Sequence, residues 1–192
     1  MEATSRTRPT ILALSGSLRK GAYSTLILGV ISDYLAEHAE VVPFSVGTLP
    51  LYDSDQEEAA QSGPVGELRR ALAAADAVVV VTPEYNYSIP GPLKNALDWA
   101  SRPAFKSGFV GKPVLPIANS MAFTGGARVH AHLRDVFGSV LARTVPFAEV
   151  CIGQVHTKCK DGKLTDEGTQ QVLQQAAKAL LEDIERFTPG RA

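Results

Sequence analysis

The sequence predicts an α/β protein built on one doubly wound parallel sheet. Five short hydrophobic segments alternate with five amphipathic segments, and the hydrophobic segments are rich in β-branched residues. Strands that helices cover on both faces form such unbroken hydrophobic runs, and their alternation with helices gives parallel strands joined by right-handed crossovers. The 192 residues, 45% of them hydrophobic, suffice for a single domain spanning 1–192 with a proper core. Residues 1–8 are expected to form a polar, flexible lead-in.

The first strand is predicted over Thr10-Ile-Leu-Ala-Leu-Ser15, followed by a turn rich in glycine and serine and then a helix. The helix is expected to begin near Ser24, a plausible N-cap residue, and to bury Leu28, Ile31 and Leu35. A strand, a hydroxyl-rich turn and a helix N-terminus together form a geometry that binds phosphate. The candidate phosphate ligands are Ser15, Ser17, Arg19 and Ser24.

Two better-known phosphate loops are excluded by the residues of this turn. Gly16 and Gly21 have the spacing that begins a Walker A loop, but Ala22-Tyr23 occupies the place of the required Lys-Ser/Thr pair. The turn also lacks the GxGxxG pattern of dinucleotide-binding folds. It therefore suits a single phosphate monoester, and the alternative is a flexible, solvated turn without a ligand.

A second strand is expected over Glu40-Val-Val-Pro-Phe44, and Pro43 places it at an edge of the sheet because proline cannot donate to a neighbouring strand. Residues 45–64 form a long loop that contains Leu49-Pro-Leu-Tyr-Asp53. A loop of this length in a compact protein usually has a function or covers another part of the molecule. The helix that follows is expected from Val65 to Ala75.

The central strand is the β-branched run from Ala77 to Val81. Pro92 suits the first turn of the next helix, whose inner face carries Leu93, Leu97 and Ala100. The loop between them lies at the carboxyl edge of the sheet, where ligands of open α/β sheets bind. Its tyrosine rings and amide suit a flat aromatic ligand with a polar rim. The candidate residues are Glu84, Tyr85, Asn86 and Tyr87, and the alternative is a proline-stiffened turn whose tyrosines plug the core.

The last third of the chain repeats the alternation. A fourth strand is expected over Lys112–Ala118, and it ends in a turn whose glycines permit close approach of a ligand. The candidate ligand contacts in this turn are Gly125 and Gly126. The next helix is expected to carry Val129, Leu133, Val136/Phe137 and Val140/Leu141 on one face. A fifth strand is expected over Phe147–Ile152, and Thr165-Asp-Glu precedes a long final helix.

These elements suit a three-layer, flavodoxin-like sandwich with a five-stranded parallel sheet in the order 2-1-3-4-5. That order puts the first and third strands side by side at the switch point and the proline-bearing second strand at an edge. The three candidate turns then meet at one carboxyl edge. A phosphate site beside a site for a flat aromatic ring fits FMN.

Cysteine and histidine spacing does not predict a metal site. Cys151 and Cys159 do not form a CxxC pair, and no histidine cluster has metal-ligand spacing. Cys151 is expected to be a buried small hydrophobe. Cys159 is expected to be an exposed, idle thiol, although its lysine neighbours could lower its pKa. His130 and His132 point away from each other on a helix, so they are expected to be surface or interface residues.

The composition also narrows the range of partners. A formal net charge of −1 with no basic block disfavours nucleic acids and anionic membranes. No hydrophobic run approaches 18 residues, and the first residues lack the hydrophobic core of a signal peptide. A soluble, cytoplasmic location is therefore expected.

The chain is similar to the NAD(P)H-dependent FMN reductase family, and most of all to its quinone and chromate reductases. The similarity covers residues 10–187 and rests on Gly16-Ser-Leu-Arg-Lys-Gly21, Leu49-Pro-Leu-Tyr-Asp53, Thr82-Pro-Glu-Tyr-Asn-Tyr-Ser88, Gly91-x-Leu-Lys-Asn-Ala-x-Asp-Trp99, Gly111-Lys-Pro113 and Gly125-Gly-Ala-Arg128. The chain departs from the family pattern at Ala22 and Ser24, where relatives carry serine and asparagine.

This resemblance implies tightly held FMN, NADPH or NADH as electron donor, and dimers or tetramers. It implies two-electron, ping-pong reduction of a small-molecule acceptor: a quinone, chromate or free flavin. The flavin carries this chemistry, so no catalytic side chain is expected. The resemblance assigns Ser15, Ser17, Arg19 and Ser24 to the FMN phosphate, Pro83 to Tyr87 to the isoalloxazine, and Ser120, Gly125 and Gly126 to the ribityl or ring side.

Two other functions remain open from the sequence. The protein could be a dedicated oxidoreductase that supplies reduced flavin to a monooxygenase or oxidises one biosynthetic intermediate. It could instead be a flavodoxin-type electron carrier. Such carriers are usually strongly acidic around the flavin, and the net charge of −1 disfavours this reading.

Overall fold

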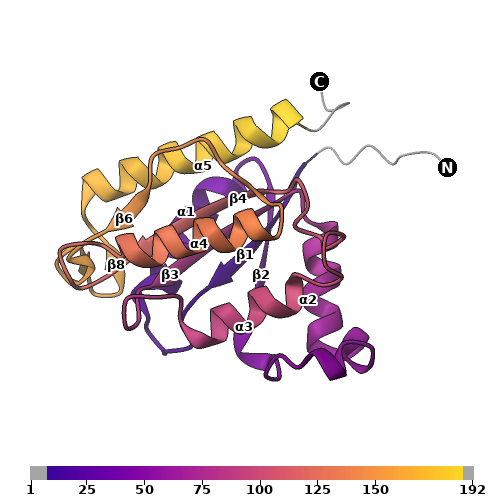
Figure 1. Ribbon diagram of the computed structural model, residues 1–192. Helices are drawn as coiled ribbons and strands as arrows, with labels where there is room; N and C mark the ends of the chain where they lie inside the picture. The colour runs from indigo at the N-terminus through magenta and orange to yellow at the C-terminus, as the bar shows by residue number, and fades with distance from the viewer. Residues whose placement is uncertain (1–7, 188–192) are drawn as a thin grey trace.

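The computed structural model describes residues 8–187, so most of the expected lead-in over residues 1–8 lies outside it. A parallel sheet forms the middle layer, with its strands in the order β2-β1-β3-β4-β5 and with β6 also paired to β4. Helices cover both faces of the sheet (Figure 1). The predicted flavodoxin-like order is confirmed. The strands are β1 (Thr10–Ser15), β2 (Glu40–Phe44), β3 (Ala77–Pro83), β4 (Pro113–Asn119), β5 (Arg143–Thr144) and β6 (Val150–Ile152).

Alternating side chains of the central strands divide the core in two. Val79 and Val81 of β3 pack on one face, in a cluster with residues of α1 (Tyr23–Ala36) and α5 (Glu167–Phe187). Val78 and Val80 pack on the other face with three helices. Both faces of β3 are thus fully buried, which accounts for its unbroken hydrophobic run. The three helices of the second face are α2 (Gly63–Ala74), α3 (Gly91–Ala100) and α4 (Ala127–Ser139).

The fifth strand differs from the prediction. One strand was expected over Phe147–Ile152, but β5 and β6 are two short strands that pair with successive parts of β4. Pro146 lies between them and has no N–H to give to β4. The Phe147 N–H donates to the Val145 carbonyl at 2.8 Å, which closes a tight local turn. The chain therefore bulges away from β4 between its two points of pairing.

Two helix ends also differ from expectation. α1 begins at Tyr23 after the extended residue Ala22, so Ser24 lies inside the first turn and is not the N-cap residue. α4 ends at Ser139, which leaves Val140 and Leu141 outside it.

At α5 the carboxylate of Asp166 accepts the Thr169 N–H and hydroxyl at 2.9 and 2.6 Å, as an N-cap side chain does. Hydrogen bonds from Thr169 and then from Lys158 lower the pKa of Asp166 to about 2.

The long loop over residues 45–64 is fastened to α3. The Pro50 carbonyl accepts the Trp99 ring N–H and an Asn95 amide N–H, each at 2.8 Å. Tyr52 packs edge-on against Trp99 with ring centroids 4.9 Å apart. The loop contains three short 3₁₀ turns, Val46–Thr48, Ser54–Gln56 and Ala59–Gln61, which were not predicted. It therefore covers the outer side of α3, as the length of the loop suggested.

A small antiparallel hairpin of β7 (Cys159–Lys160) and β8 (Lys163–Leu164) was not predicted. Its turn is Asp161-Gly162, and both residues have positive φ. An Asp-Gly pair is a strong hairpin signal, but strands of two residues carry no detectable alternation. Among residues 8–187 no helix has the length and hydrophobicity needed to cross a membrane.

Candidate functional site

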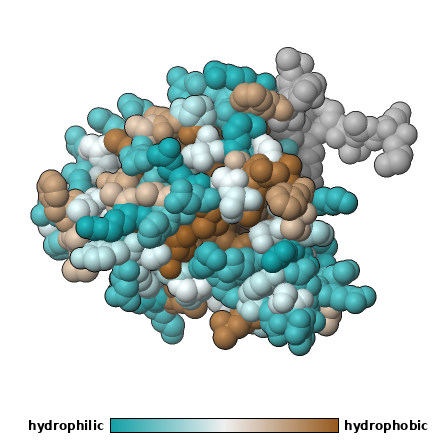
Figure 2. Space-filling model, viewed as in Figure 1, coloured by the Kyte–Doolittle hydropathy of each residue, from teal (hydrophilic) through white to brown (hydrophobic). Residues whose placement is uncertain are grey.

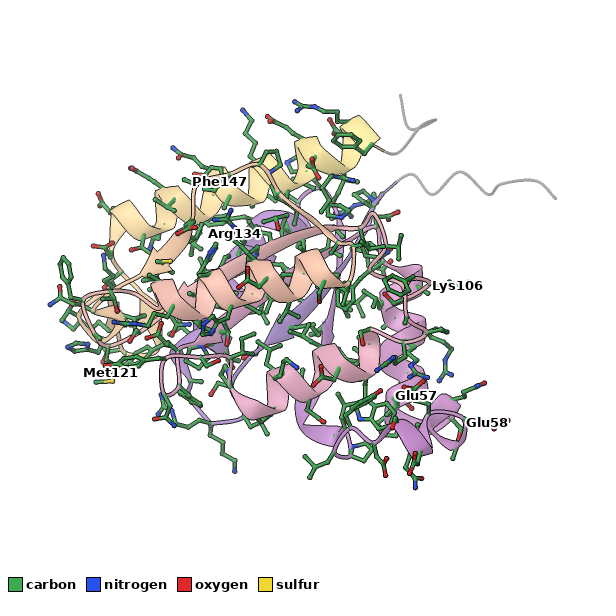
Figure 3. All side chains as sticks on the ribbon, viewed as in Figure 1. Glu57, Glu58, Lys106, Met121, Arg134 and Phe147 are labelled. Carbon is green, nitrogen blue, oxygen red and sulfur yellow. The ribbon has the colours of Figure 1, made fainter. Side chains whose placement is uncertain are left out.

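The turns after β1, β3 and β4 meet at the carboxyl edge of the sheet and enclose a cleft of about 390 Å³. Met121, on the turn after β4, marks this edge at the left of Figure 3. The cleft has the size of small-molecule sites. It is lined by Ser17, Arg19, Ala22, Tyr23, Ser24, Pro83, Glu84, Tyr85, Asn119, Ser120, Met121 and Val155. Seven of the twelve predicted site residues are therefore brought together here: Ser17, Arg19, Ser24, Pro83, Glu84, Tyr85 and Ser120.

The turn after β1 presents the N-terminus of α1 to the cleft. No side chain in the described part of the chain caps this helix, and its first turn has no acidic residue, so its first N–H groups and positive dipole end are open to an anion. Ser17 Oγ lies 3.3 Å from the Tyr85 hydroxyl, which joins the first turn to the second. Ser15 does not line the cleft, because its hydroxyl faces Thr25 at 3.1 Å and the Ser17 backbone at 3.4 Å.

Asn119, the last residue of β4, was not predicted as a site residue. Its side-chain N–H donates to Ser24 Oγ at 2.8 Å and to the Thr82 carbonyl at 3.0 Å. Ser24 is only 1% exposed, and because its oxygen accepts this bond its own proton can be donated to a ligand. A polar residue at the end of a buried strand was a usable signal. The hydrogen bond between Asn119 and Ser24 was not predictable, because the two residues are far apart in the chain.

Glu84 lines the cleft, but its carboxylate accepts hydrogen bonds from the first turn of α4. The side chain is 8% exposed and accepts the backbone N–H groups of Arg128 and Val129 at 3.0 and 3.2 Å. The Arg128 guanidinium lies 3.5 Å from the same carboxylate. Because α4 follows Gly126 and has no side-chain cap of its own, Glu84 completes the helix N-terminus from another element.

Residues 85–88 form a tight turn rather than a core plug. Tyr85 and Ser88 exchange backbone hydrogen bonds of 3.1 and 3.0 Å, and Asn86 and Tyr87 between them both have positive φ. Tyr85 is 47% exposed and Tyr87 66% exposed, which rules out the core-plug alternative. The Arg128 guanidinium lies 4.1 Å from the centre of the Tyr87 ring. Asn86 and Tyr87 stand outside the lining of the cleft.

Gly125 and Gly126 approach protein backbone and side chains rather than the cleft. A Cβ on Gly125 would lie 2.6 Å from the Cys151 carbonyl oxygen, and one on Gly126 would lie 3.0 Å from the Ala118 Cβ. Both have positive φ. Close packing of the turn on β4 and β6 therefore explains these two glycines.

The histidine and cysteine expectations need correction. His130 is buried, not a surface residue, whereas His132 is exposed. Cys159 is partly buried, and burial raises the pKa of its thiol, so the neighbouring lysines do not activate it. Burial and then the carboxylates of Glu149 and Glu84 raise the pKa of Cys151 to about 11, which makes it a poor nucleophile.

The sheet order and the phosphate-type turn at the switch point define a flavodoxin-like protein. The family model for NADPH-dependent FMN reductases matches residues 9–157. A quinone reductase of Escherichia coli is 38% identical over 180 residues, which are 92% of this chain and 95% of the relative. A 2-hydroxy-1,4-benzoquinone reductase of a Burkholderia species is 34% identical over 85% of this chain and 90% of its own.

Among solved structures, the flavoenzyme FerB of Paracoccus denitrificans, an NAD(P)H:(acceptor) oxidoreductase, superposes with a TM-score of 0.83. It is 33% identical and the match covers 93% of this chain and 98% of that one. The chain belongs to the NADPH-dependent FMN reductase family and is an NAD(P)H-dependent flavoenzyme.

Proposed function

We propose that the protein binds FMN in the cleft beside α1 and uses electrons from NADPH or NADH to reduce quinones by two electrons. The observation that carries this proposal is the uncapped N-terminus of α1, which faces the cleft with Ser17 and Ser24 at the switch point of the sheet. Relatives named as quinone reductases support the choice of acceptor. Chromate and free flavin are further acceptors that the family resemblance suggests.

The residues of the cleft fit the two halves of FMN. The hydroxyls of Ser17 and Ser24, with the helix N–H groups and Arg19, suit the phosphate. Pro83, Tyr85 and Ser120 line the part of the cleft that is left for the ring and its ribityl chain, and Ser15, Asn86, Tyr87, Gly125 and Gly126 are proposed to support it from outside. Bound FMN supplies the hydride chemistry, so the protein only has to hold the ring and keep one face accessible.

The rim of the cleft leaves room for a flat acceptor. Tyr85 and Met121 are largely exposed although they line it, and Tyr87 is exposed beside it. The rings of Tyr85 and Tyr87 offer apolar faces on which a quinone or a nicotinamide can stack. The small-molecule acceptor is therefore proposed to bind at this exposed edge.

The test is to purify the protein, release its flavin and measure turnover. We expect FMN rather than FAD, and NAD(P)H-dependent reduction of a benzoquinone. Ser17→Ala should weaken FMN binding by about 1–3 kcal/mol, because a donor to a charged phosphate is lost. Ser139→Ala, at the far end of α4, is the matched control and should bind FMN normally. Bound FAD, or a colourless protein that ignores added FMN, would overturn the proposal.

We further propose that the protein is a cytoplasmic homodimer or homotetramer. Trp99 and Phe109 are in the core of the chain and are not available to a partner. Other apolar side chains remain exposed, including Leu18, Leu51, Phe105 and Phe123. Figure 2 also shows hydrophobic residues at the surface between α3 and α4. Exposed apolar surface of this kind is typical of interfaces.

Sedimentation equilibrium at micromolar concentration should give a mass of at least twice the 20.4 kDa of one chain. The FMN-loaded and FMN-free forms should both be measured, because the exposed rim of the cleft contributes to this surface. A species with the mass of a single chain in both forms would refute the oligomer while leaving the cofactor site unaffected.

A further inference from the structure

A second group of chemically reactive side chains lies between α4 and the edge strand β6. It consists of His130 of α4, Glu149 immediately before β6, and Cys151 within β6. One potential ligand atom from each of the three lies within 4.8 Å of the other two. In Figure 1 the orange segment after α4 runs back beside this helix to β6, and Figure 3 labels Arg134 and Phe147 in that region.

His130 carries the observation that distinguishes this group from a chance cluster. Its side chain is 4% exposed, and no group among residues 8–187 meets hydrogen-bond geometry at the buried Nδ1, although the Pro116 backbone lies near the ring. The nearest charged atom is Glu149 Oε1 at 3.9 Å, which is too far for a hydrogen bond. Buried polar atoms are nearly always paired, so an unpaired ring nitrogen that faces a carboxylate and a thiol points to a missing ligand.

The electrostatic surroundings favour a cation at this point. Negative charge is concentrated beside Cys151, where the carboxylates of Glu149 and Glu84 lie near its thiol. One competitor is present, since Arg134 Nη1 holds Glu149 Oε1 at 2.6 Å.

We propose that His130, Glu149 and Cys151 bind one zinc-type divalent transition-metal ion. Imidazole nitrogen, carboxylate oxygen and thiolate sulfur are the donors that zinc takes in proteins, and three protein ligands leave the fourth position to water. The thiol proton of Cys151 passes to solvent when the metal–sulfur bond forms, and no electron is transferred.

The spacing of the three atoms requires only a small adjustment. Zinc bonds of about 2.0–2.3 Å in a tetrahedron place the ligand atoms about 3.3–3.8 Å apart. The present separations of up to 4.8 Å must therefore shrink by about 1 Å. Glu149 can make this movement because it is half exposed and precedes β6, whereas His130 is held in the core.

Bound metal would join α4 to the edge of the sheet. β6 pairs with β4 over only three residues, so few backbone hydrogen bonds hold it in the sheet. A ligand that binds only the folded state raises its stability in proportion to its affinity and concentration. Zinc is therefore expected to raise the melting temperature and to shield Cys151 from alkylation.

The experiment uses FMN-loaded, tag-free protein that has been treated with a chelator and is then titrated with Zn²⁺ alone. We expect one zinc ion per chain by native mass spectrometry and slower alkylation of Cys151, located by peptide mapping. Cys151→Ser and Glu149→Gln should weaken zinc binding by about tenfold or more. The matched controls are Cys159→Ser and His132→Asn, which should bind zinc as the unchanged protein does.

His130→Asn completes the set, but it alters a buried residue and can fail to fold. Glu149→Gln and Cys151→Ser alter partly exposed residues and keep the test decisive. The proposal is overturned if the unchanged protein takes up no stoichiometric zinc at micromolar concentration. It is equally overturned if Cys151→Ser binds zinc as well as the unchanged protein does, or if Cys159→Ser loses it. None of these readouts depends on quinone turnover, so the zinc site and the proposed function are tested independently.

Discussion

Replacing Gly16 with alanine is expected to cost the protein both its stability and its flavin. A Cβ at this position would lie 2.1 Å from Thr82 Oγ1 and 3.0 Å from the Thr82 Cα. Thr82 is fully buried in the central strand β3, so it has no room to withdraw. Steric overpacking of this kind typically costs about 1–3 kcal/mol or more. Because Gly16 joins β1 to the proposed phosphate turn, its displacement should also weaken FMN binding by more than about tenfold.

Denaturant unfolding and FMN titration of the flavin-free protein measure these two effects. The matched control is Gly29→Ala in α1, where a Cβ meets nothing within 4 Å. Alanine is favoured over glycine in a helix by about 0.5–1 kcal/mol, so this control should be at least as stable as the unchanged protein and should bind FMN normally. A Gly16→Ala protein with unchanged unfolding and unchanged FMN affinity would show that the turn does not approach β3 as closely as described.

Replacing Glu84 with alanine should have the second largest effect. It removes the acceptor for the N–H groups of Arg128 and Val129 at the start of α4, and leaves the Arg128 guanidinium without its carboxylate. Buried donors without a partner cost about 1–3 kcal/mol, so unfolding should occur at correspondingly lower denaturant concentration. FMN should also bind more weakly, because Glu84 shares its turn with Tyr85 at the cleft.

Glu84→Gln separates a capping role from a charge requirement. The amide oxygen can still accept a backbone N–H, so this variant should recover most of the stability and flavin affinity that alanine loses. Glu58→Ala, at the exposed position labelled in Figure 3, is the control for loss of a surface carboxylate. If Glu84→Ala unfolded at the same denaturant concentration as the Glu58 variant, the capping role would be wrong.

The sheet order was predictable because its signals are local. The run Val78–Val81 is hydrophobic because helices cover both faces of β3, and Pro43 marks an edge strand because it cannot donate a hydrogen bond. The fifth strand was predicted wrongly because local signals do not show how a segment pairs with its neighbour. Hydrophobicity over 147–152 indicates a strand, but the split into β5 and β6 depends on which residues of β4 lie opposite.

That Ser17, Arg19 and Ser24 line one cleft was also predictable, because they lie within eight residues of one another and a strand–turn–helix unit orients them together. The glycines after β4 were a weaker signal. A glycine can be required by a positive φ or by the close approach of another group. The sequence does not show whether that group is a ligand or another part of the protein. Here the neighbours of Gly125 and Gly126 are β6 and β4.

By itself, then, the sequence determined the strand–helix order, the burial of the central strands and the segment that opens onto the cleft. The tertiary structure alone decided that Asn119 holds Ser24, that Glu84 completes α4 and that His130 faces Glu149 and Cys151. Periodicity and turn chemistry act over a few neighbouring residues, so one chain segment is enough to reveal them. A contact between side chains of two segments depends on the packing of both, and it exists only when the whole sheet is in place.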